Sequence, residues 1–189
     1  MSRPSSREKL LATGLALVHR QGFTATGVQE ITAAAGVPKG SFYNHFPSKE
    51  AFGLAVIDAY VEAAAPAFAA LEGDAPAAER IVRHFAVIRA MLESAGLSCG
   101  CLLGNLSAEA APLSEPIRAR LAATFAMWRG ALAAAIAQGR QQGALSPGPP
   151  PAQVAEFLVG AWEGAVARAK VERTAAPFDA FAAMLPRLL

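Results

Sequence analysis

The chain has 189 residues, of which 53% are hydrophobic and 17% are charged, with 17 Lys or Arg against 15 Asp or Glu. This composition excludes a largely disordered chain, and the length suits one large domain or a small domain joined to a medium one. Alanine, the strongest helix former, supplies 45 residues, which favours an all-helical protein with closely approaching helices. No stretch without charged side chains is long enough to span a bilayer, so we expect a cytoplasmic protein without membrane contact.

The charges are unevenly distributed along the chain. Residues 1–50 hold six Lys or Arg and three Glu, a balance of +3, whereas residues 51–189 hold eleven and twelve, a balance of −1. The formal net charge of +2 disfavours a nucleic-acid binder, but a basic N-terminal part does not. We predict a small domain over residues 1–50 and a larger one over residues 51–189.

Helix start and stop signals predict about nine helices. The first runs from about Ser6 to Gln21, with Ser5 or Ser6 as its cap and Gly22 as its stop. The others are expected at about 28–35, 39–45, 51–71, between Pro76 and Gly96, and at about 101–110, 115–143, 152–173 and 177–188.

Several cap and break signals refine these helices. Thr24 or Thr26 is expected to cap the second helix, and Ser48 the fourth. Pro66 should kink the helix at 51–71 or end it early, because proline removes a backbone donor. The proline-rich segment 146–151 is expected to be a stiff connector without helix.

Two short helices, Val28–Ala35 and Lys39–His45, joined at Gly36 and Val37, have the dimensions of a helix-turn-helix motif. The second carries polar side chains that hydrogen-bond phosphates and base edges: Lys39, Ser41, Tyr43, Asn44 and His45. Spacing alone is equally compatible with a helical hairpin whose polar face is merely solvated. Phe42 is expected in the core.

The run from Gly22 to Glu50, GFTATGVQEITAAAGVPKGSFYNHFPSKE, resembles the DNA-binding signature of TetR-family transcriptional regulators. The similarity covers roughly residues 7–55, and its most specific parts are AGV at 35–37, SFYNHF at 41–46 and SKE at 48–50. The resemblance implies a homodimeric repressor, not an enzyme, with two helix-turn-helix heads that bind a palindromic operator in double-stranded DNA. It also implies a C-terminal helical domain that binds a small-molecule effector.

Positions matched to the signature imply roles for individual residues. Tyr43, His45 and Lys49 correspond to phosphate contacts, and Lys39, Gly40 and Ser41 to residues facing the major groove, with Asn44 and Gln29 nearby. Gln29 and Asn44 have amide groups suited to reading adenine. Thr26 is expected to present a hydroxyl to the DNA backbone, and Gly27 departs from the Thr or Ser common in the family. Arg3 and Arg7 could form a basic arm near DNA.

The last two helices are expected to form the dimer interface that the resemblance implies. The first carries a stripe of small and apolar residues, Val154, Leu158, Ala161, Ala165 and Ala169, and the second adds Phe178, Phe181, Met184 and Leu185. Ordinary packing inside one chain is the competing interpretation of the same residues.

The effector pocket has apolar and polar candidates. They are Phe85, Met91, Phe125, Trp128 and Trp162, with His84, Asn105 and Glu163 as the polar groups. Each is individually more often a core residue than a pocket residue. His84 and Glu163 rank higher because polar groups among apolar neighbours need partners.

Cys99 and Cys101 are the sharpest local feature of the second half. Two cysteines alone cannot complete a four-ligand zinc site, so no metal and no cofactor is expected. Cys101 is expected to start a helix, where backbone N–H groups favour a thiolate. The stretch from Gly100 to Glu109 also resembles the NemR/AcuR-like subgroup of TetR-family regulators, which is associated with electrophilic or unsaturated small molecules. A cysteine switch and a non-covalent pocket both remain open.

Two other function classes compete with a DNA-binding regulator. A helical enzyme would need a nucleophile and base, yet His19, His45 and His84 lie on separate elements. A helical interaction protein that does not bind DNA is disfavoured by the basic head and the polar second helix of the motif.

Overall fold

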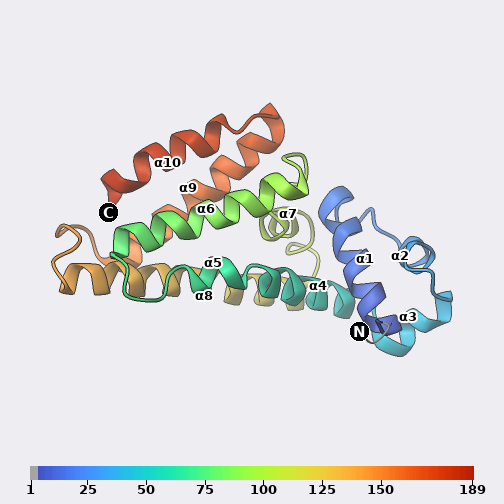
Figure 1. The fold of residues 1–189 in the computed structure, drawn as a ribbon. Helices are drawn as coiled ribbons and strands as arrows, with labels where there is room; N and C mark the ends of the chain where they lie inside the picture. The colour runs from blue at the N-terminus through green and yellow to red at the C-terminus, as the bar shows by residue number, and fades with distance from the viewer. Residues whose placement is uncertain (1–3) are drawn as a thin grey trace. The chain divides into compact units, whose positions relative to one another are not determined.

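The computed structural model describes residues 4–189, and these residues form an all-helical fold, as predicted (Figure 1). Ten helices follow one another along the chain: α1 (Ser6–Gln21), α2 (Val28–Ala34), α3 (Lys39–His45), α4 (Lys49–Ala63), α5 (Ala65–Ala69), α6 (Ala77–Ala95), α7 (Leu102–Glu109), α8 (Glu115–Gln141), α9 (Pro151–Glu172) and α10 (Ala176–Leu188). None of the helices is long and apolar enough to cross a membrane.

Pro66 accounts for the tenth helix. The helix expected at 51–71 is divided into α4, which ends at Ala63, and α5, which begins at Ala65. Pro66 therefore occupies the first turn of α5, where its missing N–H leaves no hydrogen bond unmade.

Two of the predicted caps are confirmed. The Glu8 N–H donates to Ser5 Oγ at 3.2 Å, and the Ser5 N–H donates to Glu8 Oε2 at 2.7 Å, which makes a capping box at the start of α1. At α4 the Ala51 N–H donates to Ser48 Oγ at 3.0 Å.

The predicted cap of α2 is wrong. Gly27 is the N-cap residue and offers no side-chain hydrogen bond, and the Thr26 hydroxyl instead donates to the Gly22 carbonyl at 2.6 Å. The Thr26 side chain is buried, so its hydroxyl closes the loop between α1 and α2. Thr24 is committed elsewhere as well, because its N–H donates to Glu109 Oε1 at 2.6 Å.

The chain folds into two compact units. Unit 1 contains the chain up to Glu62 together with Leu102–Ala122, and unit 2 contains Ala63–Cys101 and Ala123–Leu189. Each unit thus combines segments that are distant in sequence. The predicted boundary near residue 50 divides the chain into two continuous segments, whereas each compact unit combines two segments. The boundary stays a prediction.

Unit 1 is built around a cluster of aromatic rings beneath α3. Phe42, Phe46 and Phe52 pack with ring centroids 5.0 to 5.5 Å apart, and all three are buried. Helix α1 lies close against this cluster because Gly14 has no side chain, and a Cβ there would collide with the Phe52 ring. The short helices α2 and α3 are therefore held by packing, since seven residues cannot form a stable helix alone.

Unit 2 has an aromatic core of its own between α6, α9 and α10. The Trp162 ring stacks on Phe178 with 5.2 Å between centroids, and Phe85 contacts both Trp162 and Phe181. These rings are buried, so the apolar faces of all three helices meet in one core.

Candidate nucleic-acid interface and effector site

Helix α3 presents a polar face to solvent above an apolar base. Lys39, Gly40, Asn44 and His45 are exposed, and Tyr43 is 56% exposed although it is a large aromatic residue. Ser41 is half-buried, whereas Phe42 is completely buried, as predicted. The helix therefore offers donors and acceptors on one side while its other side anchors it.

The turn between α2 and α3 has the geometry that its sequence predicts. Gly36 adopts φ +65°, its N–H donates to the Ala33 carbonyl at 3.1 Å, and the Val37 N–H donates to the Thr32 carbonyl at 3.0 Å. This pair of bonds is a Schellman motif, which ends α2 and fixes the direction in which α3 starts. Gln29 lies exposed on α2.

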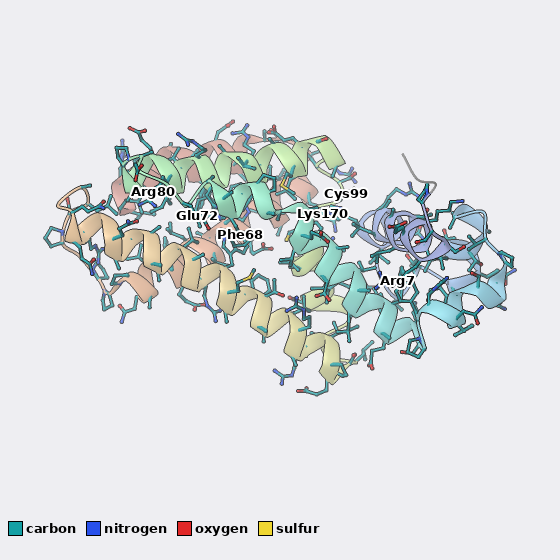
Figure 2. The ribbon with its side chains drawn as sticks, turned by 60° about the horizontal axis from the view of Figure 1, so that its bottom comes forward. Arg7, Phe68, Glu72, Arg80, Cys99 and Lys170 are labelled. Atoms are coloured by element: carbon teal, nitrogen blue, oxygen red, sulfur yellow. The ribbon has the colours of Figure 1, made fainter. Side chains whose placement is uncertain are left out.

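Arg7 lies on α1 in the same unit, with its guanidinium carbon 5.4 Å from the centroid of the Phe46 ring (Figure 2). Its side chain is exposed, so the charge stays available to a ligand. Arg3, the other residue of the predicted basic arm, lies outside the described residues.

Lys49 and Glu109 form a clamp on the loop between α1 and α2. The Phe23 and Thr24 N–H groups donate to the Glu109 carboxylate at 3.0 and 2.6 Å, and Lys49 Nζ donates to the Thr24 carbonyl at 3.2 Å. Lys49 Nζ also lies 4.7 Å from the centroid of the Phe23 ring. The last residue of α7 thereby holds the loop that leads into the helix-turn-helix, all within unit 1.

The clamp shifts the pKa of both ionisable groups. Burial lowers the pKa of Lys49, and the nearby Glu109 carboxylate opposes that shift only in part. Burial alone would raise the pKa of Glu109, but the hydrogen bonds from Thr24 and Phe23 and the charge of Lys49 together lower it below its ordinary value. A lowered pKa keeps the Glu109 carboxylate charged at neutral pH.

Gly22 makes room for the clamp. It adopts φ +95°, which L side chains rarely do, and a Cβ there would lie 2.9 Å from Glu109 Oε2. Sequence reasoning identified Gly22 as a helix stop but missed Glu109, since its partners lie 85 residues earlier in the chain.

His84 and Trp128, both predicted for the effector pocket, are bonded to each other in the core of unit 2. The Trp128 indole N–H donates to His84 Nε2 at 2.7 Å, and His84 Nδ1 donates to the Ala67 carbonyl at 2.7 Å. Burial lowers the pKa of His84 to about 4, and the bond to Ala67 offsets this only in part. The imidazole is thus neutral, with both ring nitrogens occupied.

Cys101 and Glu163 are brought together in unit 2. The Cys101 thiol hydrogen-bonds the Glu163 carboxyl, while Oε1 of that carboxyl is buried and has no partner among residues 4–189. Burial raises the pKa of Glu163, and the hydrogen bond from Cys101 opposes this rise. Cys99 is also a buried thiol and donates to the Ala95 carbonyl at 3.2 Å.

The remaining effector candidates are divided between the two units. Phe85 and Trp162 line a small cleft of about 100 Å³ in unit 2, and the Trp162 indole N–H is buried without a partner among the described residues. Phe125 is half-buried and stacks on Trp128, 6.5 Å between centroids. Asn105 belongs to unit 1, half-buried on α7. Within residues 4–189 no group of three or more His, Cys, Asp or Glu side chains is placed to hold a metal ion.

The stripe predicted for the dimer interface faces largely inward. Val154, Leu158, Ala165 and Ala169 are buried within their own chain, as are Phe178, Phe181 and Leu185. The neighbouring face is the open one: Phe157 is 57% exposed, and a groove of about 380 Å³ runs between α9 and α10 past Phe157, Gly164, Arg168 and Met184. The most apolar stripe of α9 packs into the core of its own chain. The surface left open for a partner is therefore the neighbouring face of α9, which carries Phe157.

Two protein-family models match this chain, one in its N-terminal part and one in its C-terminal part. The model of the bacterial regulatory proteins of the tetR family matches residues 10–56, and that of the tetracyclin repressor-like C-terminal domain matches residues 55–185.

The chain belongs to the TetR family.

Similar TetR-family proteins extend over nearly the whole chain. The HTH-type transcriptional repressor DhaR of a Mycobacterium species is 38% identical over 96% of this chain and 90% of its own length. The repressor NemR of Escherichia coli is 36% identical over 92% of this chain and 88% of its own. The crystal structure of reduced E. coli NemR superposes with a TM-score of 0.86, at 34% identity and 97% coverage of both chains.

A regulatory protein TetR from Rhodobacter sphaeroides superposes with a TM-score of 0.89, at 33% identity over 97% of this chain and 98% of that one. The resemblance to the TetR family and to NemR-like relatives is therefore confirmed. TetR-family proteins are DNA-binding transcriptional regulators and not enzymes, so membership of this family argues against the helical-enzyme alternative.

Proposed function

We propose that this TetR-family protein is a cytoplasmic homodimeric repressor that binds a palindromic operator through α2 and α3 and is released by a small organic or electrophilic effector. The polar, exposed face of α3 over buried Phe42 carries the proposal. The DNA-binding part is assigned to residues 1–50, and the ligand-binding and dimerisation part to residues 51–189.

The proposed contacts follow the exposure of the side chains. Lys39, Gly40, Ser41 and Asn44 face the major groove with Gln29, while Tyr43, His45 and Lys49 contact phosphates. Lys49 can do so because an ammonium has three donors and only one reaches Thr24. Thr26 is withdrawn from this set, since its buried hydroxyl is donated to Gly22.

Replacing Lys49 by Gln tests the proposed phosphate contacts. We expect weaker binding to DNA from upstream of the protein's own gene, and a plot of log affinity against log salt whose slope is smaller by about 1, because one phosphate neutralisation is lost. Arg187→Gln removes the same charge from exposed Arg187 at the end of α10 and should leave the slope unchanged. Equal slopes for Lys49→Gln and the parent protein, measured by fluorescence anisotropy, would contradict the assignment.

Effector chemistry at Cys101 is the second part of the proposal. Glu163 accepts a hydrogen bond from the thiol and its pKa is raised, so its carboxylate is a better base for the thiol proton. The sulfur then forms a C–S bond to the β-carbon of an α,β-unsaturated carbonyl compound, and the α-carbon receives a proton in place of the broken π bond. The similar protein NemR of Escherichia coli was crystallised in a reduced form, which fits a relative that responds to redox state.

The thiol proposal is tested by adding methyl vinyl ketone to the protein–operator complex. We expect the parent protein and Cys99→Ser to release DNA and to gain one adduct by intact mass, because both retain Cys101. Cys101→Ser should stay bound. Release of Cys101→Ser at the same ketone concentration would instead favour a non-covalent effector pocket.

A further inference from the structure

Arg80 is a buried cation near the start of α6. Arg80 is only 3% exposed, although its guanidinium stays charged at every physiological pH. Removing such a charge from water is costly unless an anion or several good acceptors surround it.

The structure supplies Arg80 with neutral acceptors only. Nη1 donates to the Leu71 carbonyl at 2.6 Å, and Nη2 donates to Gln138 Oε1 at 2.6 Å. Nε is buried and has no hydrogen-bond partner, and within residues 4–189 no carboxylate forms an ion pair with Arg80. Within residues 4–189 the guanidinium therefore lacks an ion-pair partner, and its Nε lacks a hydrogen-bond partner.

Arg80 lines a cavity of about 530 Å³ in unit 2. Phe68 and Glu72 border it from α5 and the turn that follows, and Ala131, Ala134 and Gln138 border it from α8. Phe68, Glu72 and Arg80 are labelled together in Figure 2. An aromatic ring and alanine methyl groups also line the cavity and offer apolar contacts to a hydrocarbon body.

We propose that this cavity binds a small organic monocarboxylate, with the carboxylate on the Nε and Nη2 edge of Arg80 and the hydrocarbon body against Phe68 and the alanines of α8. That edge of a guanidinium donates two parallel N–H bonds, which a carboxylate accepts in a bidentate pair. Gln138 is exposed, so its amide can turn outward and give up Nη2. The ligand supplies Nε with a partner and the guanidinium with a counter-ion. The cavity volume lies in the range of small-molecule sites, about 300 to 1,000 Å³.

Glu72 sets the charge of the ligand. Its side chain borders the same cavity and is exposed. A second carboxylate on the ligand would meet this like charge, so a monoanion is favoured over a dianion. The inference does not rest on the proposed function, because binding is measured on the protein without DNA.

Titration calorimetry on the full chain with hexanoate, hexanamide and adipate tests the site. We expect hexanoate to bind at least about tenfold more tightly than the neutral amide and the dianion, since only the monoanion pairs with Arg80 without meeting Glu72. Arg80→Lys keeps the charge but loses the bidentate edge, and it should weaken hexanoate binding about tenfold. Glu72→Gln should strengthen it.

A cavity-filling variant keeps the test valid if Arg80→Lys fails to fold. Ala134→Trp places an indole in the cavity while Arg80 is kept, and it should abolish hexanoate binding, whereas Ala126→Trp, at an exposed position of the same helix outside the cavity, should bind like the parent protein. Equal affinity for hexanoate and hexanamide, unchanged binding in Ala134→Trp, or weaker binding in Glu72→Gln would each overturn the proposal.

Discussion

At the scale of single residues, burial decides which polar side chains serve the fold and which remain for ligands. His84 and Asn44 are both polar residues on helices, yet His84 is fully buried with both nitrogens bonded and Asn44 is exposed on α3. The sequence pattern ranked His84 as a pocket residue because it could not show that Trp128, 44 residues away, supplies its partner.

The buried neutral state of His84 predicts a pH dependence of stability. Its pKa is lowered to about 4 in the folded protein, so between this value and the unfolded value near 6.5 only the unfolded chain takes up a proton. The stabilisation is complete above pH 6.5 and is lost as the pH falls toward 4, by about 3 kcal/mol for this one group.

Urea unfolding at several pH values measures this effect. The parent protein should lose stability across that window more steeply than His84→Gln, which is less stable at pH 7 but cannot take up the proton. The same pH slope for both proteins would contradict the assignment of the effect to His84.

At the scale of secondary-structure elements, the sequence predicted where the helices lie better than it predicted which helices and loops contact one another. The bounds of α1 and α3 were predicted to the residue, because caps and glycine stops are local signals. The role of α7 could not be predicted in this way. Its last residue, Glu109, binds the loop between α1 and α2, and that contact exists only after the chain has folded.

Glu109→Gln tests the clamp between α7 and the loop. A Gln side chain has one acceptor oxygen in place of two and no charge to pair with Lys49, so we expect a loss of about 1 kcal/mol in unfolding free energy. Hydrogen exchange at the Phe23 and Thr24 amides should accelerate.

Glu115→Gln is the matched control for this clamp. The exposed Glu115 forms its ion pair, as far as residues 4–189 show, with Arg118 on its own helix, and its loss should leave both amides unaffected. Unchanged exchange in Glu109→Gln would show that the loop is held by other contacts.

At the scale of the whole molecule, the open face of α9 and α10 suits a second copy of the chain. Phe157 and Met184 are large apolar residues left exposed beside a groove, and TetR-family proteins typically dimerise. Most of the stripe between Val154 and Ala169, which was expected at this interface, is instead buried in the core of unit 2.

Phe157→Glu should break the dimer. An aromatic side chain buried at the centre of an interface contributes strongly to the binding free energy. Its replacement by a charge should raise the dimer dissociation constant about 100-fold. Analytical ultracentrifugation measures the change. Leu113→Glu makes the same kind of change at a residue 80% exposed in unit 1, which contains neither α9 nor α10, and should remain dimeric. A Phe157→Glu protein that stays dimeric at low concentration would place the interface elsewhere.

The sequence by itself determined the helical class, the turn at Gly36 and the residues that α3 presents, because helix periodicity, caps and glycine stops act over a few neighbouring residues. It also carried the TetR-family signature between Gly22 and Glu50. Only the tertiary structure decided that Thr26 is buried, that His84 is satisfied by Trp128, that Glu109 holds the α1–α2 loop and that Arg80 borders a cavity. Each of these depends on segments distant in sequence meeting in space, which no local pattern records.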